Sequence, residues 1–255
     1  MVRYEVGEGR ATITLDEPER RNPMSVETME ELADRTAEAM RDRDVRVIVY
    51  TGAGDRAFSA GGDLKAGFVD DAVGRHASRG ALARLFRTMW DGGTPTVARV
   101  NGHALAGGFG LAVACDVTVC VEDARLGMPE VTVGLWPMMI TVAVARCMTP
   151  KAAFELMVTG RTIDAREALR LGAVSRVVAA EDLDAAVDEV ADALAALSPA
   201  VVGRGRRAFF AAEDLARDAA LDLLQGGLTA VSLTEDAAEG VRAFLEKRDP
   251  EWSGR

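Results

Sequence analysis

Three short stretches of the sequence hold residues whose types and spacing suit proton transfer next to a stabilised negative charge. Two are rich in glycine, namely residues 57–65 (AFSAGGDLK) and 100–112 (VNGHALAGGFGLA). The third, residues 127–135 (GMPEVTVGL), places a single carboxylate, Glu130, among small and apolar residues. A glycine costs roughly 1 kcal/mol relative to alanine inside a helix. We therefore expect these glycines to meet a need that side chains would obstruct.

Each glycine-rich stretch follows a predicted strand and precedes a predicted helix. In α/β sheets this is where ligands bind, beyond the carboxyl ends of the strands. Free backbone N–H groups at a helix start hold an anionic oxygen, and the helix dipole assists them. Two such groups from separate loops, aimed at one point, would form an oxyanion hole. Ordinary glycine-rich turns remain the alternative, since neither stretch has the spacing of a dinucleotide-binding motif or a P-loop.

Two interpretations of Glu130 remain open from the residues alone. Pro129 precedes it, and the first turn of a helix is a common place for an acidic side chain. Alternatively, apolar surroundings disfavour the charged carboxylate and raise its pKa. A carboxyl group with a raised pKa carries protons effectively near neutral pH.

The elements that must position these stretches alternate between strands and helices. Alternating and β-branched runs predict strands at residues 3–8, 10–15, 45–50, 96–100, 116–121 and 173–178. Helical spacing predicts helices at residues 25–43, 70–91, 138–148, 151–159, 164–171, 182–197, 199–212, 215–230 and 234–247. This order predicts an α/β fold with crossover connections. We place a boundary near Ser198, between a core of residues 1–198 and a helical region of residues 199–255.

The composition narrows the class of protein and of partner. The chain has 255 residues, of which 49% are hydrophobic and 27% are charged, as is typical of a soluble globular protein. Its net charge of −10 argues against nucleic acid or an anionic membrane as the main partner. No apolar run approaches the ~20 residues of a membrane span. The three cysteines lack paired spacing, so we expect a cytoplasmic protein without a metal site.

Nearly the whole chain resembles the crotonase superfamily, the enoyl-CoA hydratase/isomerase family. The resemblance runs in order through residues 20–25 (RRNPMS), the three stretches above, residues 156–178 and residues 234–252. It implies a crotonase-type spiral of β-β-α repeats with a C-terminal helical region that mediates trimerisation. It also implies a homotrimer or a dimer of trimers that binds an acyl-CoA thioester and stabilises its enolate. No cofactor is expected, because coenzyme A is part of the substrate.

The resemblance also implies roles for individual residues. The backbone amides of Gly62 and Gly107 would form the oxyanion hole, and Glu130 would be the acid/base. Asp63 would orient the turn that holds Gly62. The other residues expected at the substrate are Ala60 and Leu64 along the CoA channel, Arg20, Arg21 and Lys65 towards the CoA phosphates, Trp136 and Met138 at the acyl pocket, and Gly110. Surface ion pairs explain the cations equally well, and core packing explains Trp136 and Met138 equally well.

Position 110 departs from the pattern of the family's hydratases, which carry a second glutamate three residues after the oxyanion glycine. Here that residue is Gly110, on nearly the same helix face as Gly107. Residues 136–140 (WPMMI) also lack the aspartate that other branches place there. Glu130 alone can remove a proton from C2 and return it at C4, so we predict isomerisation of a Δ3- to a Δ2-enoyl-CoA. Hydration of a 2-enoyl-CoA by Glu130, alone or with an unidentified group, and non-catalytic acyl-CoA binding remain alternatives.

Overall fold

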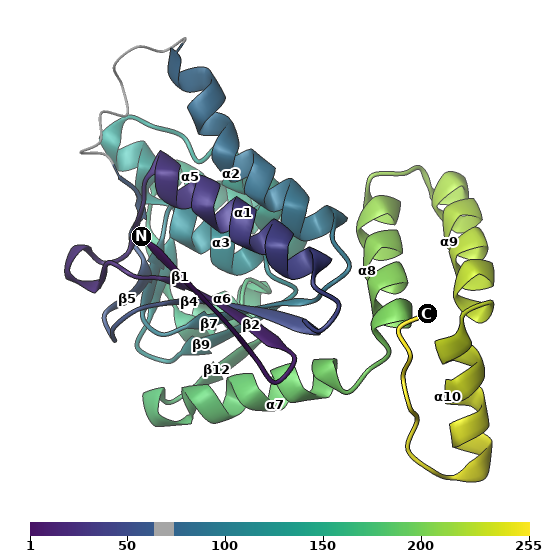
Figure 1. Ribbon diagram of the computed structural model, residues 1–255. Helices are drawn as coiled ribbons and strands as arrows, with labels where there is room; N and C mark the ends of the chain where they lie inside the picture. The colour runs from purple at the N-terminus through teal and green to yellow at the C-terminus, as the bar shows by residue number, and fades with distance from the viewer. Residues whose placement is uncertain (64–73) are drawn as a thin grey trace.

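The computed structural model describes residues 1–63 and 74–255, and its main sheet has the strand order β1-β2-β4-β7-β9-β12 (Figure 1). The first two strands form an antiparallel hairpin, and the later strands join it in parallel. The strands are β1 (Val2–Gly7), β2 (Arg10–Leu15), β4 (Val47–Gly52), β7 (Thr96–Val100), β9 (Val117–Val121) and β12 (Arg176–Val178). Each corresponds to a strand predicted from the sequence.

A second sheet, with the order β11-β10-β8-β5, carries the stretches that contain the glycines and Glu130. Its strands are β5 (Ala57–Ser59), β8 (His103–Leu105), β10 (Arg125–Gly127) and β11 (Thr162–Asp164). These four strands are too short to show periodicity, and they were not predicted. The glycine-rich stretches of residues 57–65 and 100–112 follow β4 and β7, as predicted from the sequence. Each stretch contains one of the short strands, β5 or β8, and its glycines at positions 61–62 or 107–108 come after that strand.

The helices complete a repeating spiral. After β4, β7 and β9 the chain adds a strand to the small sheet, namely β5, β8 and β10, and then forms a helix, as in β7, β8 and α3. The helices of this part are α1 (Val26–Arg41), α2 (Gly74–Asp91), α3 (Gly107–Ala114), α4 (Ile140–Cys147), α5 (Pro150–Thr159), α6 (Ala165–Leu171) and α7 (Leu183–Ala195). Figure 1 shows α7 on the opposite side of the main sheet from α1 and α3. None of the helices described is long and apolar enough to cross a membrane.

Three further helices, α8 (Pro199–Glu213), α9 (Arg217–Ser232) and α10 (Glu235–Glu246), stand beside the sheets in Figure 1. Arg206 of α8 connects them to the core. Its Nε donates to Oδ2 of Asp116 at 2.8 Å, and its Nη1 donates to the carbonyl oxygens of Met89 and Gly92 at 2.6 and 2.8 Å. Only 6% of the Arg206 side chain is exposed. The role of residues 199–255 in trimerisation stays a prediction.

We expect Arg206→Met to lower the free energy of unfolding by about 3 kcal/mol, because it leaves Asp116 and two carbonyl groups without their buried cation. Urea denaturation followed by circular dichroism measures the change. Arg217→Met is the matched control, since Arg217 and its partner Asp218 have side chains that are 87% and 83% exposed. Surface pairs of this kind contribute about 0–1 kcal/mol, so equal losses in the two variants would contradict the anchoring role.

Candidate functional site

The three stretches that contain the candidate catalytic residues meet at one end of the small sheet, where strands β5, β8 and β10 finish. Strands β5, β8 and β10 are neighbours in this sheet and run parallel. The chain therefore leaves all of them at the same edge, which is where α/β sheets bind ligands. The segments that leave them contain Gly62, Gly107 and Glu130, respectively. The backbone N–H of Ala106 also donates to the carbonyl of Gly127 at 2.8 Å, which ties the second segment to the third.

The two glycine segments approach each other closely. A Cβ built on Gly61 would lie only 2.6 Å from Cβ of Ala106 and 3.1 Å from the amide nitrogen of Gly107. A Cβ on Gly107 would lie 3.9 Å from the amide nitrogen of Gly62. Gly107 begins α3, and Ala106 before it supplies no side-chain cap. Because the first amides of a helix have no partner within it, this arrangement can present backbone donors from two loops to one anionic oxygen.

Two buried polar side chains hold the first glycine segment in place. Oγ of Ser59 donates to the carbonyl of Asn22 at 2.8 Å and accepts from the N–H of Gly61 at 3.1 Å. Asn22 has φ of 53° and is 1% exposed, and its Nδ2 donates to the carbonyl of Ala57 at 2.8 Å. Neither side chain was predicted to support the site. The available signal was an asparagine in a turn, where left-handed backbone is common.

Glu130 combines both interpretations drawn from the sequence. It lies in the first turn of a short 3₁₀ helix, Pro129–Val133, directly after the proline. Its Oε2 is buried and has no hydrogen-bond partner among the residues that the structure describes. Burial raises the pKa of Glu130 above the ordinary value of a glutamate. The arrangement favours uptake of a proton, as general acid–base chemistry near neutral pH requires.

Arg20 and Arg21 connect the early part of the chain to the Gly62 segment. Arg20 donates through Nη2 to Oδ2 of Asp63 at 2.5 Å and through Nη1 to Oε2 of Glu17 at 3.0 Å. The carbonyl of Arg21 accepts from the N–H of Ala60 at 2.9 Å. Asp63 is thus held by Arg20, and its role in orienting the turn stays a prediction. The contact of Arg20 or Arg21 with a CoA phosphate stays a prediction.

The other predicted contact residues differ in their surroundings. Trp136 is half-buried against the core, with its ring 6.0 Å from that of Phe154. Met138 is 69% exposed. Leu64 and Lys65 lie outside the described residues. Contact of any of these residues with a substrate stays a prediction.

Gly110 is fully enclosed rather than open. It is buried within α3, and Ile140 of α4 packs directly against its α-carbon.

His103, which lies nearby in the sequence, accepts a hydrogen bond at Nδ1 from the N–H of Arg125 at 3.1 Å. This histidine therefore satisfies a backbone group.

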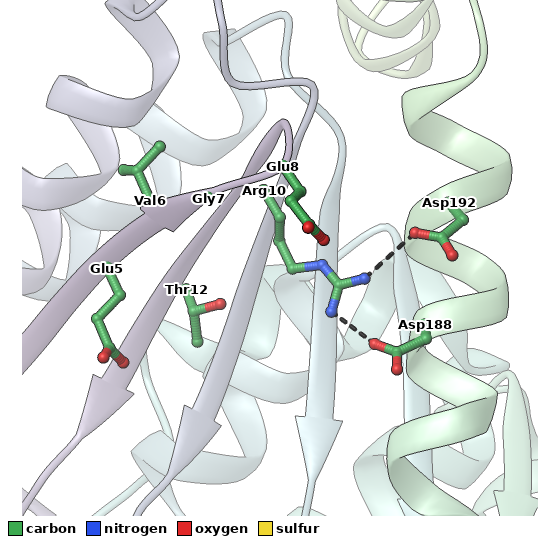
Figure 2. A pocket seen from close by; sticks show the side chains of 8 residues that line it. All are labelled: Glu5, Val6, Gly7, Glu8, Arg10, Thr12, Asp188 and Asp192. Carbon is green, nitrogen blue, oxygen red and sulfur yellow. Dashed lines mark hydrogen bonds and ion pairs between the residues drawn. The ribbon is translucent and has the colours of Figure 1, made fainter.

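A hollow of about 480 Å³ lies elsewhere, between the β1–β2 hairpin and α7 (Figure 2). Arg10 within it donates to Asp188 at 2.6 Å and to Asp192 at 3.4 Å. Arg10 pairs with Val47, the first residue of β4, so the hollow lies at the amino ends of the parallel strands. Ligands of α/β sheets bind at the opposite ends. We therefore place the candidate site at the glycine segments and Glu130.

Comparison with known proteins identifies relatives along the whole chain. Residues 5–255 match the family described as Enoyl-CoA hydratase/isomerase. Carnitinyl-CoA dehydratase of Proteus mirabilis is 36% identical over 248 residues, which cover 95% of this chain and 94% of that protein. The crystal structure of enoyl-CoA hydratase from Mycobacterium smegmatis has a TM-score of 0.94 and 32% identity, with 98% of each chain covered.

The crystal structure of enoyl-CoA hydratase from Bacillus anthracis is a further neighbour. Its TM-score is 0.93 at 30% identity, and the match covers 100% of this chain and 99% of that one. The fold is thus the crotonase-type α/β spiral that the sequence predicted. The chain belongs to the enoyl-CoA hydratase/isomerase family.

Proposed function

We propose that the protein stabilises the enolate of an acyl-CoA thioester at the amides of Gly62 and Gly107, while Glu130 transfers the proton. The observation that carries this proposal is the joint position of two close glycine amides and a buried carboxylate at one sheet edge. A negative oxygen needs donors that are already in place when the charge develops. The proton needs a carboxyl group whose pKa lies near the working pH.

The reaction that one carboxylate supports best is movement of the double bond from C3–C4 to C2–C3. Glu130 removes a proton from C2, which the thioester acidifies, and the electron pair spreads to the thioester oxygen. The two amides stabilise this dienolate. Glu130 then returns the proton at C4, so that no water, oxidant or reductant is consumed. A backbone or side-chain donor of this type contributes about 3–4 kcal/mol to such a transition state.

Hydration of a 2-enoyl-CoA, or the reverse dehydration, is the second candidate reaction. The names of the relatives favour it, since they are a carnitinyl-CoA dehydratase and enoyl-CoA hydratases. Water addition requires a group that holds water at C3 while a proton reaches C2. Gly110 provides no such group, so Glu130 would act alone or with a second group that is not yet identified. We therefore rank isomerisation first.

We further propose a homotrimer or a dimer of trimers, as the resemblance implies. Large apolar side chains of α9 and α10, among them Leu221, Leu228, Phe244 and Leu245, are exposed in the single chain, as expected of a surface that a second copy covers. The net charge of −10 supports a small-molecule substrate over nucleic acid. We propose a cytoplasmic enzyme that needs no cofactor beyond the coenzyme A of its substrate.

We expect Glu130→Gln to lower kcat about 10²–10⁴-fold, because the amide cannot exchange the proton. Chromatography of the products from a panel of 3-enoyl- and 2-enoyl-CoA thioesters measures the loss and identifies the reaction. Glu181→Gln, at an exposed position, is the control and should retain wild-type turnover. Full activity of the Glu130 variant would exclude the mechanism. A wild-type chain that binds thioesters without turnover would instead indicate a non-catalytic acyl-CoA-binding protein.

The same substitution should raise the melting temperature at pH 8. The folded-state pKa of Glu130 is raised by burial, so the protonated form stabilises the fold and this stability is lost as the pH rises through that pKa. The glutamine variant carries no charge and avoids the loss. We therefore expect its advantage to widen with pH and to vanish towards the ordinary pKa of glutamate. A pH series of thermal melts measures it, and an advantage independent of pH would contradict the assignment.

Gly107→Ala should fold normally and yet lose activity. The added Cβ would lie 3.6 Å from Cε of Met24 and 3.9 Å from the amide of Gly62, both ordinary contact distances. It would nevertheless occupy space beside the two donors, so we expect kcat/KM to fall about 100-fold with little change in melting temperature. Gly205→Ala, whose new Cβ meets nothing within 4 Å, is the control. Unchanged turnover in the Gly107 variant would remove this amide from the proposed oxyanion hole.

A further inference from the structure

Ile140 lies directly against the α-carbon of Gly110, and this contact decides what position 110 can hold. Gly110 lies three residues after Gly107 in α3 and is fully buried. A Cβ built on it would lie 2.1 Å from Cγ2 of Ile140 and 2.6 Å from its Cβ. Real Cβ atoms essentially never approach other atoms within 3.0 Å. No side chain therefore fits at position 110 while Ile140 keeps its place.

The surrounding chain holds Ile140 in this place. Ile140 is the first residue of α4 and is 3% exposed. Thr141, which follows it, donates both its N–H and its hydroxyl to the carbonyl of Pro137, at 3.2 and 2.6 Å. Further back, the N–H of Leu135 donates to the carbonyl of Glu130 at 3.0 Å. A short hydrogen-bonded segment thus links Ile140 to the backbone of Glu130.

We propose that Ile140 is a specificity-determining residue, which restricts the site to proton transfer by covering Gly110 with an apolar side chain. The proposal rests on the proposed function, in which Gly107 and Glu130 act on an acyl-CoA thioester. Because residues three apart lie on nearly the same helix face, a polar side chain at position 110 would lie next to the oxygen that Gly107 binds. Such a side chain would give a water molecule a hydrogen-bond partner next to that oxygen.

The apolar side chain of Ile140 over Gly110 affects hydration and isomerisation differently. Adding water across a double bond requires water to be held by groups that accept its protons. An isoleucine side chain offers neither a donor nor an acceptor, and ordered water needs 2–4 polar partners. Proton transfer from C2 to C4 needs only one carboxyl group. The Gly110–Ile140 pair therefore leaves the reaction of Glu130 intact and removes support for hydration.

The first test compares two variants of nearly equal shape, Ile140→Thr and Ile140→Val. Both side chains are smaller than isoleucine, so both variants should fold, and they differ by a hydroxyl in place of a methyl. Hydration of a 2-enoyl-CoA and isomerisation of a 3-enoyl-CoA are measured on each preparation. We expect the ratio of hydration to isomerisation to be at least threefold higher in Ile140→Thr. Equal ratios would overturn the proposal, whatever fraction of each variant is folded.

The second test exchanges the pair in Gly110→Glu/Ile140→Gly. Glycine is needed at position 140, because alanine would keep the Cβ that lies 2.6 Å from the new one. Gly110→Gln/Ile140→Gly is the matched control, equal in size and uncharged. Reactions run in ¹⁸O-labelled water, and mass spectrometry of the 3-hydroxyacyl-CoA reports hydration. We expect at least tenfold more hydration from the glutamate pair, and the inference is wrong if both pairs hydrate equally.

The single variant Gly110→Glu shows whether Ile140 is the obstacle. We expect a lower melting temperature and no gain in hydration, because Ile140 still occupies the space. If the single variant hydrates as fast as the glutamate pair, Ile140 gives way easily and does not determine specificity.

Failure of the proposed function has a different signature. It would appear as wild-type turnover that is absent or insensitive to Glu130→Gln. Failure of the present proposal would appear as Glu130-dependent turnover whose ratio of hydration to isomerisation is the same in all variants of position 140. A wild-type ratio already dominated by hydration would also overturn it.

Discussion

The close approach of Gly61 to residues 106–107 is the constraint on which the site depends. No side chain fits on Gly61, and Ala106 has φ of 51° and ψ of −127° at the contact. A non-glycine residue at such angles costs about 1–3 kcal/mol and persists only where its surroundings hold it. Here the pairing of β8 with β5 and β10 and the hydrogen bond from Ala106 to Gly127 hold it. The consequence is that two amides from distant parts of the chain lie together.

In this fold the main sheet supplies the buried core, and the small sheet positions the segments of the candidate site. Long strands such as β4 are buried along their whole length and supply the core, whereas the small sheet consists of three-residue strands that would not be stable alone. Asn101, which directly follows β7, links the two sheets: its Oδ1 accepts from the N–H of Gly52 in β4 at 3.2 Å, and its Nδ2 donates to the carbonyl of Ala57 in β5 at 3.5 Å. The segments of the candidate site are thus held against a buried sheet.

The same separation explains what was predictable from the sequence. Strands β4, β7 and β9 show β-branched runs, and helices such as α1 show apolar spacing and a Ser25 cap that accepts from Thr28, so local patterns were sufficient. Strands β5, β8 and β10 are too short for a pattern, and only pairing between distant segments creates them. Glu130 and the glycines could be recognised locally. The contact of Gly110 with Ile140 joins two helices, and nothing in either segment alone indicates it.

Among the described residues, the proposed site has one carboxylic acid, Glu130, and the pKa of a single acid depends on fewer neighbouring charges than that of a pair. Burial raises the pKa of Glu130 more than a backbone hydrogen bond lowers it. A second carboxylate nearby would raise this pKa further, because like charges disfavour the ionised form. Two-acid sites must therefore place each carboxyl in an environment that moves its pKa separately. Because Ile140 packs against Gly110, no carboxyl group fits at position 110, and Glu130 has no second acid there whose pKa must be kept apart from its own. In the proposed mechanism, the same contact that denies water a partner leaves burial as the main influence on the pKa of Glu130.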